Sequence, residues 1–291
     1  MQPITSHRYG DSEVNVAFQV VDLHQARSPR GEGTLGVPDG YQRQSEDLQL
    51  CLLSGFELRS GGEEIVVPYG SQRLIAFLAL QTRPVHRSYV SGSLWPEASE
   101  DRAAACLRSA MWRVPCPDGQ TVVISGPCNL RLVREAKVDY RETVEWATAL
   151  INGQPEVDPS SWPRFSGFSQ ELLPDWYDEW VLFERERFRQ LRLHALESVC
   201  ERLVQQGHYP QALMAGLAAV AAEPLRESAH RLVVRAHIGE GNFYEAYRQY
   251  CSCAALLEAE LGVGPSPAME ALIGRGRRGK VNRRGRPRAR A

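Results

Sequence analysis

Residues 94–114 read LWPEASEDRAAACLRSAMWRV, and this stretch decides how the first half of the chain folds. After Asp101 the stretch holds three arginines and no acid. On a helical wheel of about 100° per residue, small and apolar residues gather on one side. They are Ala103, Ala104, Leu107, Ala110, Met111 and Val114. The opposite side and its flanks carry Arg102, Ala105, Arg108, Ser109, Trp112 and Arg113. The pattern predicts a helix over 101–114 that packs on one side and exposes guanidinium groups on the other.

The segments around this helix indicate a winged helix. Upstream, residues 47–69 predict a β-hairpin around Gly61-Gly62, and 71–82 and 86–95 predict two helices, the first with Ser71 in position to cap it. Downstream, Pro115 and Pro117 stop the third helix, and 121–133 predict a second hairpin around Gly126-Pro127. A hairpin, three helices and a closing hairpin together describe a winged helix-turn-helix.

The second half of the chain is helical and contains a repeat. Gly207-His208-Tyr209-Pro210-Gln211-Ala212 recurs as Gly241-Asn242-Phe243-Tyr244-Glu245-Ala246, at an offset of 34 residues. At the same offset Ala195 matches Ala229, and Val199 matches Val233. This is the period of tetratricopeptide helix pairs, in which glycine makes the turn and alanine lets the two helices approach. We therefore expect tetratricopeptide-like helices over 137–274.

Charge is segregated along the chain although the total is −1. Residues 48–137 carry 10 basic and 8 acidic residues, residues 138–274 carry 11 and 20, and residues 275–291 carry 9 and none. The 7 cysteines, with no signal-peptide pattern and no apolar run long enough to span a membrane, predict free thiols in a protein of the cytoplasm. Residues 1–46 are expected to be a variable, mobile leader, and 275–291 a disordered basic tail.

The helix at 101–114 is the candidate DNA-reading element, because arginine pairs bidentately with guanine or clamps phosphate. A solvated basic face is the alternative. In the second hairpin, Asn129 and Arg131 either touch the DNA backbone or are ordinary hairpin residues. The tail contains Arg284-Gly285-Arg286-Pro287, which resembles an AT-hook core, but four residues in an arginine-rich tail are a weak match, and the composition favours a nonspecific basic arm.

Nothing in the sequence indicates catalysis, a cofactor or a metal. The Gly-Gly-Glu-Glu run at 61–64 matches a nucleotide-cyclase motif but lies in a hairpin rather than in a long α/β domain. P-loop, zinc-protease and serine-hydrolase motifs are absent. Cys251 and Cys253 fall in a predicted helix, where residues two apart point to different sides.

Several segments together resemble the Streptomyces antibiotic regulatory protein family, in its small form. The resemblance rests on SQRLIAFLAL (71–80), the stretch at 94–114, ELLPDWYDEWVLFERERFRQLRLHALESV (171–199) and YEAYRQYCSCAALLEAELGVGPSPAMEAL (244–272). It implies an OmpR-type winged helix at 47–136 followed by an all-α, tetratricopeptide-like bacterial transcriptional activator domain at 137–274. The fold class expected is mainly α with a small β component.

The resemblance also implies function and partners. Such proteins activate transcription of antibiotic and other secondary-metabolite genes by binding direct repeats in promoter double-stranded DNA, with a homodimer expected on the DNA and the protein on the nucleoid. They recruit RNA polymerase holoenzyme, including the sigma factor, partly through the loop between the second and third helices. That loop is Pro96, Glu97, Ala98, Ser99, Glu100 and Asp101 here. Cys106 stands where such proteins often have Asn or Thr. The sequence leaves one alternative open, a helical-repeat scaffold whose winged helix binds protein.

Overall fold

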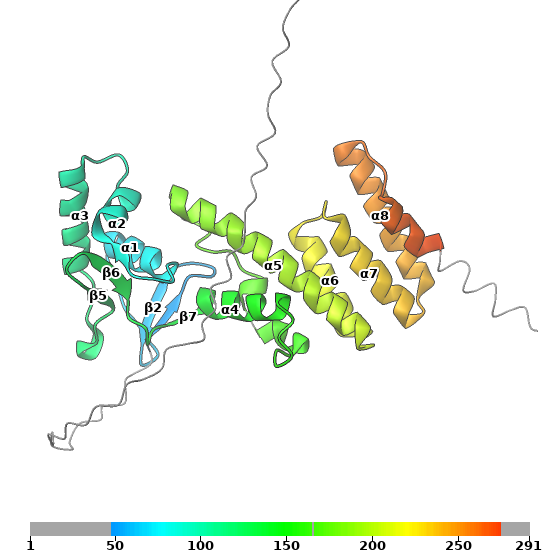
Figure 1. The fold of residues 1–291 in the computed structure, drawn as a ribbon, viewed down its shortest axis with the longest axis horizontal. Helices are drawn as coiled ribbons and strands as arrows, with labels where there is room; N and C mark the ends of the chain where they lie inside the picture. The colour runs from blue at the N-terminus through cyan, green and yellow to red at the C-terminus, as the bar shows by residue number, and fades with distance from the viewer. Residues whose placement is uncertain (1–47, 165, 275–291) are drawn as a thin grey trace, which may run out of the picture. The chain divides into compact units, whose positions relative to one another are not determined.

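The computed structural model describes residues 48–164 and 166–274, so the expected leader and basic tail lie outside the described residues. The chain is mainly helical with two small sheets, as predicted (Figure 1). The strands are β1 Gln49–Cys51, β2 Glu57–Ser60, β3 Glu63–Glu64, β4 Val85–His86, β5 Val123–Ser125, β6 Asn129–Leu132 and β7 Lys137–Val138. The α-helices are α1 Tyr69–Ala79, α2 Arg87–Leu94, α3 Glu100–Trp112, α4 Asp139–Ile151, α5 Glu179–Gln205, α6 Tyr209–Ala222, α7 Glu227–Glu240 and α8 Phe243–Leu261. Short 3₁₀ turns cover Pro117–Gly119, Pro159–Arg164 and Ser166–Phe168.

The first sheet has the order β3-β2-β1-β7. The turn between β2 and β3 is the expected Gly61-Gly62, with φ of 58° and 88°. Positive φ at both central residues is the requirement of a tight hairpin turn, which glycine meets without a steric cost. The Gly-Gly-Glu-Glu run is therefore a hairpin, as the sequence indicates. The strand predicted before this turn is divided into β1 and β2, which pair antiparallel, and the parallel partner of β1, strand β7, was not predicted.

The second sheet, β4-β6-β5, contains the predicted hairpin and one further strand. Strand β4 pairs with β6, with Val85 opposite Leu130 and His86 opposite Asn129. Against it pack α1, α2 and α3, whose apolar residues form a core that includes Leu74, Leu94 and Leu107. The expected cap at Ser71 is wrong: α1 begins after Pro68, and the buried Ser71 hydroxyl donates to the Ala110 carbonyl of α3 at 2.7 Å.

The winged helix shares its core with the segment that leads into α5. Five buried residues of that region join the same apolar cluster: Leu172, Leu173, Trp176, Val181 and Phe188. Leu53 forms an antiparallel bridge with Leu172. The Asp139 carboxylate accepts the backbone N–H groups of Leu52 and Leu53 at 2.9 and 3.1 Å, and burial raises its pKa. These contacts join the two halves through one continuous core.

Helices α5 to α8 follow one another as the predicted repeat (Figure 1). Gly207 and Gly241 have φ of 78° and 88° at the turns before α6 and α8. Ala212 and Ala246, at equivalent repeat positions, are buried. The buried Gly216 of α6 lies so close to α7 that a Cβ there would meet Val233 Cγ2 at 2.8 Å. These observations confirm the tetratricopeptide-like reading of this region.

The last helical residues, 267–274, close the array. Glu227 at the start of α7 accepts hydrogen bonds from the Ser266 backbone N–H, at 2.7 Å, and from its hydroxyl. Met269 is fully buried beside Val234 and Leu257. All 7 cysteines are free, and Cys251 is exposed while Cys253 is buried, as their spacing on a helix predicts. None of the helices described is long and apolar enough to cross a membrane.

Candidate nucleic-acid interface

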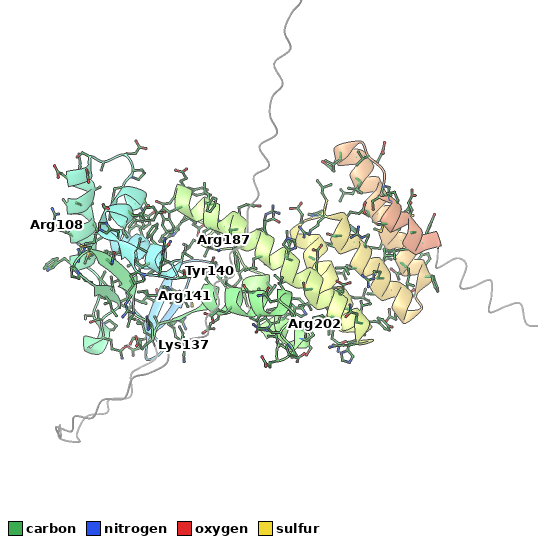
Figure 2. All side chains as sticks on the ribbon, viewed as in Figure 1. Arg108, Lys137, Tyr140, Arg141, Arg187 and Arg202 are labelled. Carbon is green, nitrogen blue, oxygen red and sulfur yellow. The ribbon has the colours of Figure 1, made fainter. Side chains whose placement is uncertain are left out.

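Helix α3 has the two faces that its sequence predicts. Ala103, Leu107 and Ala110 are buried against the winged-helix core, and Met111 and Val114 pack beside them. The opposite face is exposed, and Trp112 keeps 87% of its surface open to solvent. Figure 2 shows Arg108 at the outer edge of this helix. The exposed face carries Arg102, Ala105, Arg108, Ser109, Trp112 and Arg113. Cys106 and Ala104 are half-buried at its border.

The arginines of α3 differ from those of the helical half in their partners. Every arginine of residues 139–274 whose side chain is described donates to a backbone carbonyl or pairs with a carboxylate. Within the described part of the chain, Arg102, Arg108 and Arg113 have neither kind of partner. An exposed guanidinium without a partner keeps all of its donors available for a ligand. Three guanidinium groups without a partner are therefore gathered on one face of one helix. Arg83 and Arg134, also exposed and without such a partner among the described residues, lie elsewhere in the winged helix.

The second hairpin is fixed against α2 and α3 by Arg87, a residue that the sequence prediction missed. Its guanidinium donates to the Ser125 hydroxyl and, at 3.3 Å, to the Gly126 carbonyl at the hairpin tip. It also reaches Met111 Sδ of α3 at 3.5 Å. The Arg87 backbone N–H donates to the Cys128 carbonyl at 2.8 Å. Together with the pairing of β4 and β6, Arg87 thus holds the hairpin beside α3.

The two hairpin residues singled out from the sequence lie in different surroundings. Asn129 is exposed at the start of β6. Arg131 is half-buried, and its Nη1 atom is enclosed without a hydrogen-bond partner among the described residues. Alternation along the strand places both side chains on the face opposite to Leu130 and Leu132, which lie in the core, so it does not account for this difference. Asn129 is therefore the better placed of the two for contact with a ligand.

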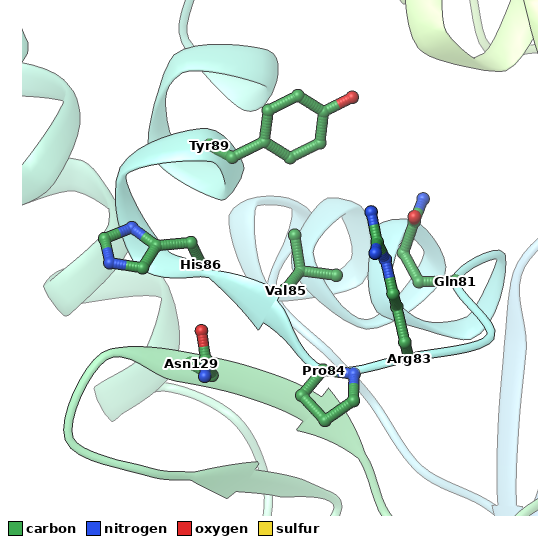
Figure 3. Close-up of a pocket in the computed structure, with 7 residues that line it drawn as sticks. All are labelled: Gln81, Arg83, Pro84, Val85, His86, Tyr89 and Asn129. Atoms are coloured by element: carbon green, nitrogen blue, oxygen red, sulfur yellow. The ribbon is translucent and has the colours of Figure 1, made fainter.

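A surface pocket of about 400 Å³ lies beside Asn129 (Figure 3). Its polar walls come from the α1–β4 turn, from β4 and α2, and from β6. The residues that line it are Gln81, Arg83, Pro84, Val85, His86, Tyr89 and Asn129. Arg83 and His86 are exposed and escaped the sequence prediction. The run Arg83-Pro84-Val85-His86-Arg87, with its basic side chains, could have indicated these two residues from the sequence.

The segment expected to contact polymerase is shorter than predicted. Helix α3 begins at Glu100, so Glu100 and Asp101 form its first turn and only Pro96, Glu97, Ala98 and Ser99 of that set precede it. Acidic side chains in a first turn interact favourably with the helix dipole, which explains the earlier start. Glu97, Glu100 and Asp101 are all exposed. Among the residues that the structure describes, no group of three metal-ligating side chains comes together.

The family comparison matches the helical half. The profile described as "BTAD: Bacterial transcriptional activator domain" covers residues 165–275. Helices α5 to α8 and the closing turns at 267–274 lie within the matched range.

Two similar proteins extend the comparison to the winged helix. The regulatory protein AfsR of Streptomyces coelicolor is 26% identical over 247 residues, which cover 79% of this chain and 24% of AfsR. The chain thus spans about a quarter of that relative's length. The structure of Mycobacterium tuberculosis EmbR in complex with a low-affinity phosphopeptide matches with a TM-score of 0.64 at 19% identity, over 80% of this chain and 66% of EmbR. That likeness shows the fold. The family match and the similarity to AfsR agree with the resemblance to the Streptomyces antibiotic regulatory protein family on which the sequence prediction rests.

Proposed function

We propose that this chain is a sequence-specific DNA-binding transcriptional activator that reads the major groove with α3. The observation that carries the proposal is the exposed face of α3, on which Arg102, Arg108 and Arg113 have no ion-pair partner within the described residues. The major groove of B-DNA admits an α-helix, and arginine pairs bidentately with the O6 and N7 atoms of guanine. Ala105, exposed between them, leaves room for close approach.

The residues around α3 are suited to contacts with the DNA backbone. Asn129 and the pocket residues Arg83 and His86 offer donors to phosphates, which fix the register of a protein on DNA without reading bases. Glu100 and Asp101 disfavour phosphate at the first turn of α3. We therefore place Arg108, Ser109, Trp112 and Arg113, in the second half of the helix, nearest the bases.

The remaining parts of the proposal come from the family resemblance. They are promoter direct repeats as the site, a homodimer on the DNA, and an antibiotic or other secondary-metabolite pathway as the target. They also include recruitment of RNA polymerase holoenzyme through sigma by residues 96–101. The exposed acids of this segment, Glu97, Glu100 and Asp101, suit a basic patch on the partner.

The test is a selection of genomic fragments by the purified full chain, followed by gel shifts and footprints at several salt concentrations. We expect a protected promoter site whose binding weakens steeply with salt. Replacing Arg102, Arg108 and Arg113 together by alanine should abolish the specific complex. Replacing Arg187 of α5 by alanine, an exposed arginine outside the proposed interface, should leave the complex intact. Specific binding that survives the triple replacement would refute the role of α3. The scaffold alternative instead predicts no specific complex at all.

A further inference from the structure

The turn between α2 and α3 is tied to the activator domain by one partly buried arginine of α1, Arg73. Arg73 lies on a stripe of α1 with Tyr69 and Phe77, one helical turn before and after it. Its guanidinium donates to the Leu94 carbonyl at 2.6 Å, where α2 ends. The same group pairs with the Asp178 carboxylate, directly before α5. Only 16% of the Arg73 side chain and 15% of the Asp178 side chain are exposed.

Aromatic rings surround this ion pair. The Arg73 guanidinium lies 5.8 Å from the ring centre of Trp95 and 6.0 Å from that of Tyr69. At these distances a guanidinium over a ring is attracted by the π-electrons. Trp95 is the first residue of the turn that leads to α3. Tyr69 in turn contacts Trp176 edge-on, and Phe77 contacts Trp180, so rings of the α5 entry pack on the same stripe.

The Asp178 side chain bonds to Arg73 instead of capping its own helix, α5. It occupies the N-cap position of α5, where an aspartate side chain ordinarily accepts a backbone N–H of the first turn. No such bond forms here, because the carboxylate faces Arg73. The backbone carbonyl of Asp178 still accepts from Val181 and Leu182, so the helix starts at the same place. The side chain is thus committed to the winged helix rather than to α5 itself.

We propose that Arg73 is a positioning residue through which the start of α5 holds the α2–α3 turn, residues 95–99, in its active shape. Of its attachments outside α1, two, the Leu94 carbonyl and the Trp95 ring, belong to the entry of that turn, and the third, the Asp178 carboxylate, belongs to the activator domain. This inference rests on the proposed function, in which the turn touches polymerase. It gives the activator domain a role in activation that does not require its own surface to contact polymerase.

The test compares Arg73→Lys and Asp178→Asn with the wild type. Lysine keeps the charge but lacks the planar fork, so it cannot stack on Trp95 and bond to two acceptors together. Hydrogen–deuterium exchange of the full chain should show faster exchange at residues 95–99 in both variants, by about tenfold, with exchange in α6 to α8 unchanged. Arg248→Lys, an exposed arginine of α8 paired with Glu245, serves as the matched control and should change nothing in the turn. Unchanged exchange at 95–99 in both variants would overturn the inference.

A second readout separates positioning from loss of folding. The double variant Arg73→Met with Asp178→Leu replaces the ion pair by apolar side chains, an exchange that often preserves stability. It should keep the wild-type melting temperature and DNA affinity yet still loosen residues 95–99.

A transcription assay gives a further readout. With a promoter recovered in the DNA selection and holoenzyme of the host, Arg73→Lys should lower transcription several-fold at saturating protein. Faster exchange with unchanged transcription would support the positioning role and refute the polymerase role of the turn. DNA affinity that falls as much as transcription does would refute the inference.

Discussion

At the scale of single residues, Arg108 is the best candidate for reading a base. It lies in the middle of the exposed face of α3, without an ionic partner among the described residues. We expect Arg108→Lys to lower the preference for the specific site over random DNA by about 1–3 kcal/mol, because lysine cannot bond bidentately to guanine. The slope of affinity against salt should stay the same, since the charge is kept. Titration of specific and random duplexes at several salt concentrations measures both quantities. A changed slope with unchanged preference would assign Arg108 to phosphate.

Two glycines within helices should respond oppositely to alanine. At Gly216 a Cβ would meet Val233 Cγ2 at 2.8 Å and Cys200 Sγ at 3.1 Å, in the interior between α5, α6 and α7. At Gly92 of α2 nothing lies within 4 Å of the same atom. We expect Gly216→Ala to destabilise the fold by about 1–3 kcal/mol through overpacking. Gly92→Ala should stabilise it by about 0.5–1 kcal/mol, because alanine favours helix. Urea unfolding of both variants tests the pair, and a stabilising Gly216→Ala would show that α6 and α7 have room to separate.

At the scale of elements, Glu197 of α5 links this helix to α7. Arg226 donates to its two carboxylate oxygens at 2.9 and 2.8 Å, and the Ser228 hydroxyl donates as well. Burial alone would raise the pKa of Glu197, but the hydrogen bonds and the charge of Arg226 outweigh it and lower that pKa. Because the pKa of Glu197 is lower in the folded state, its ionised form stabilises the fold at pH values above the ordinary glutamate pKa of 4.5. This contribution is lost as the pH falls through the lowered pKa of the folded state.

The Glu197→Gln variant should therefore be less stable at neutral pH by about 2 kcal/mol. The difference from the wild type should shrink as the pH falls below about 4. Glu201→Gln is the matched control on the same helix, because Glu201 also pairs with an arginine of α7 but is about half exposed. Its loss should cost at most about 1 kcal/mol, as for other surface pairs. Melting curves between pH 3 and about 7 measure both differences, and equal losses in the two variants would contradict the ranking by burial.

Local patterns predicted most of the elements, and the misses have physical causes. The hydrophobic period of each helix and the glycine turn of each of the two hairpins are visible within a single segment of the sequence. Strands β4 and β7 have two residues each, too few for an alternation, and exist because distant partners pair with them. Ser71 has the residue type of a cap, yet its buried hydroxyl bonds to Ala110, 39 residues away. The exposed face of α3 followed from its period, whereas Arg87 and Arg73 gain their roles only through contacts between elements.

At the scale of the whole molecule, charge and core divide the chain at different places. Charge changes near residue 138, since residues 48–137 hold 10 basic and 8 acidic residues against 11 and 20 in 138–274. The apolar core of the winged helix continues past that point and includes Leu172, Leu173 and Phe188. In the proposed function, the first division would direct DNA to the winged helix, because a polyanion avoids the acidic half. The shared core means that the winged helix and the helical half, which the sequence predicts as two domains, have part of their interior in common.

A pair of fragments tests this dependence. A fragment of residues 48–136 carries every residue of the proposed DNA interface but lacks β7, Asp139 and the α5 entry, which leaves the Leu53 edge of the core uncovered. A fragment of residues 48–194 keeps all of them. Covering a leucine-sized side chain contributes about 1.5–3 kcal/mol, so losing several should exceed the stability of a small domain. We expect the longer fragment to unfold cooperatively and bind the selected promoter site, and the shorter one to lack a cooperative transition by circular dichroism. A shorter fragment that melts cooperatively and binds that site with wild-type affinity would show that the winged helix folds on its own.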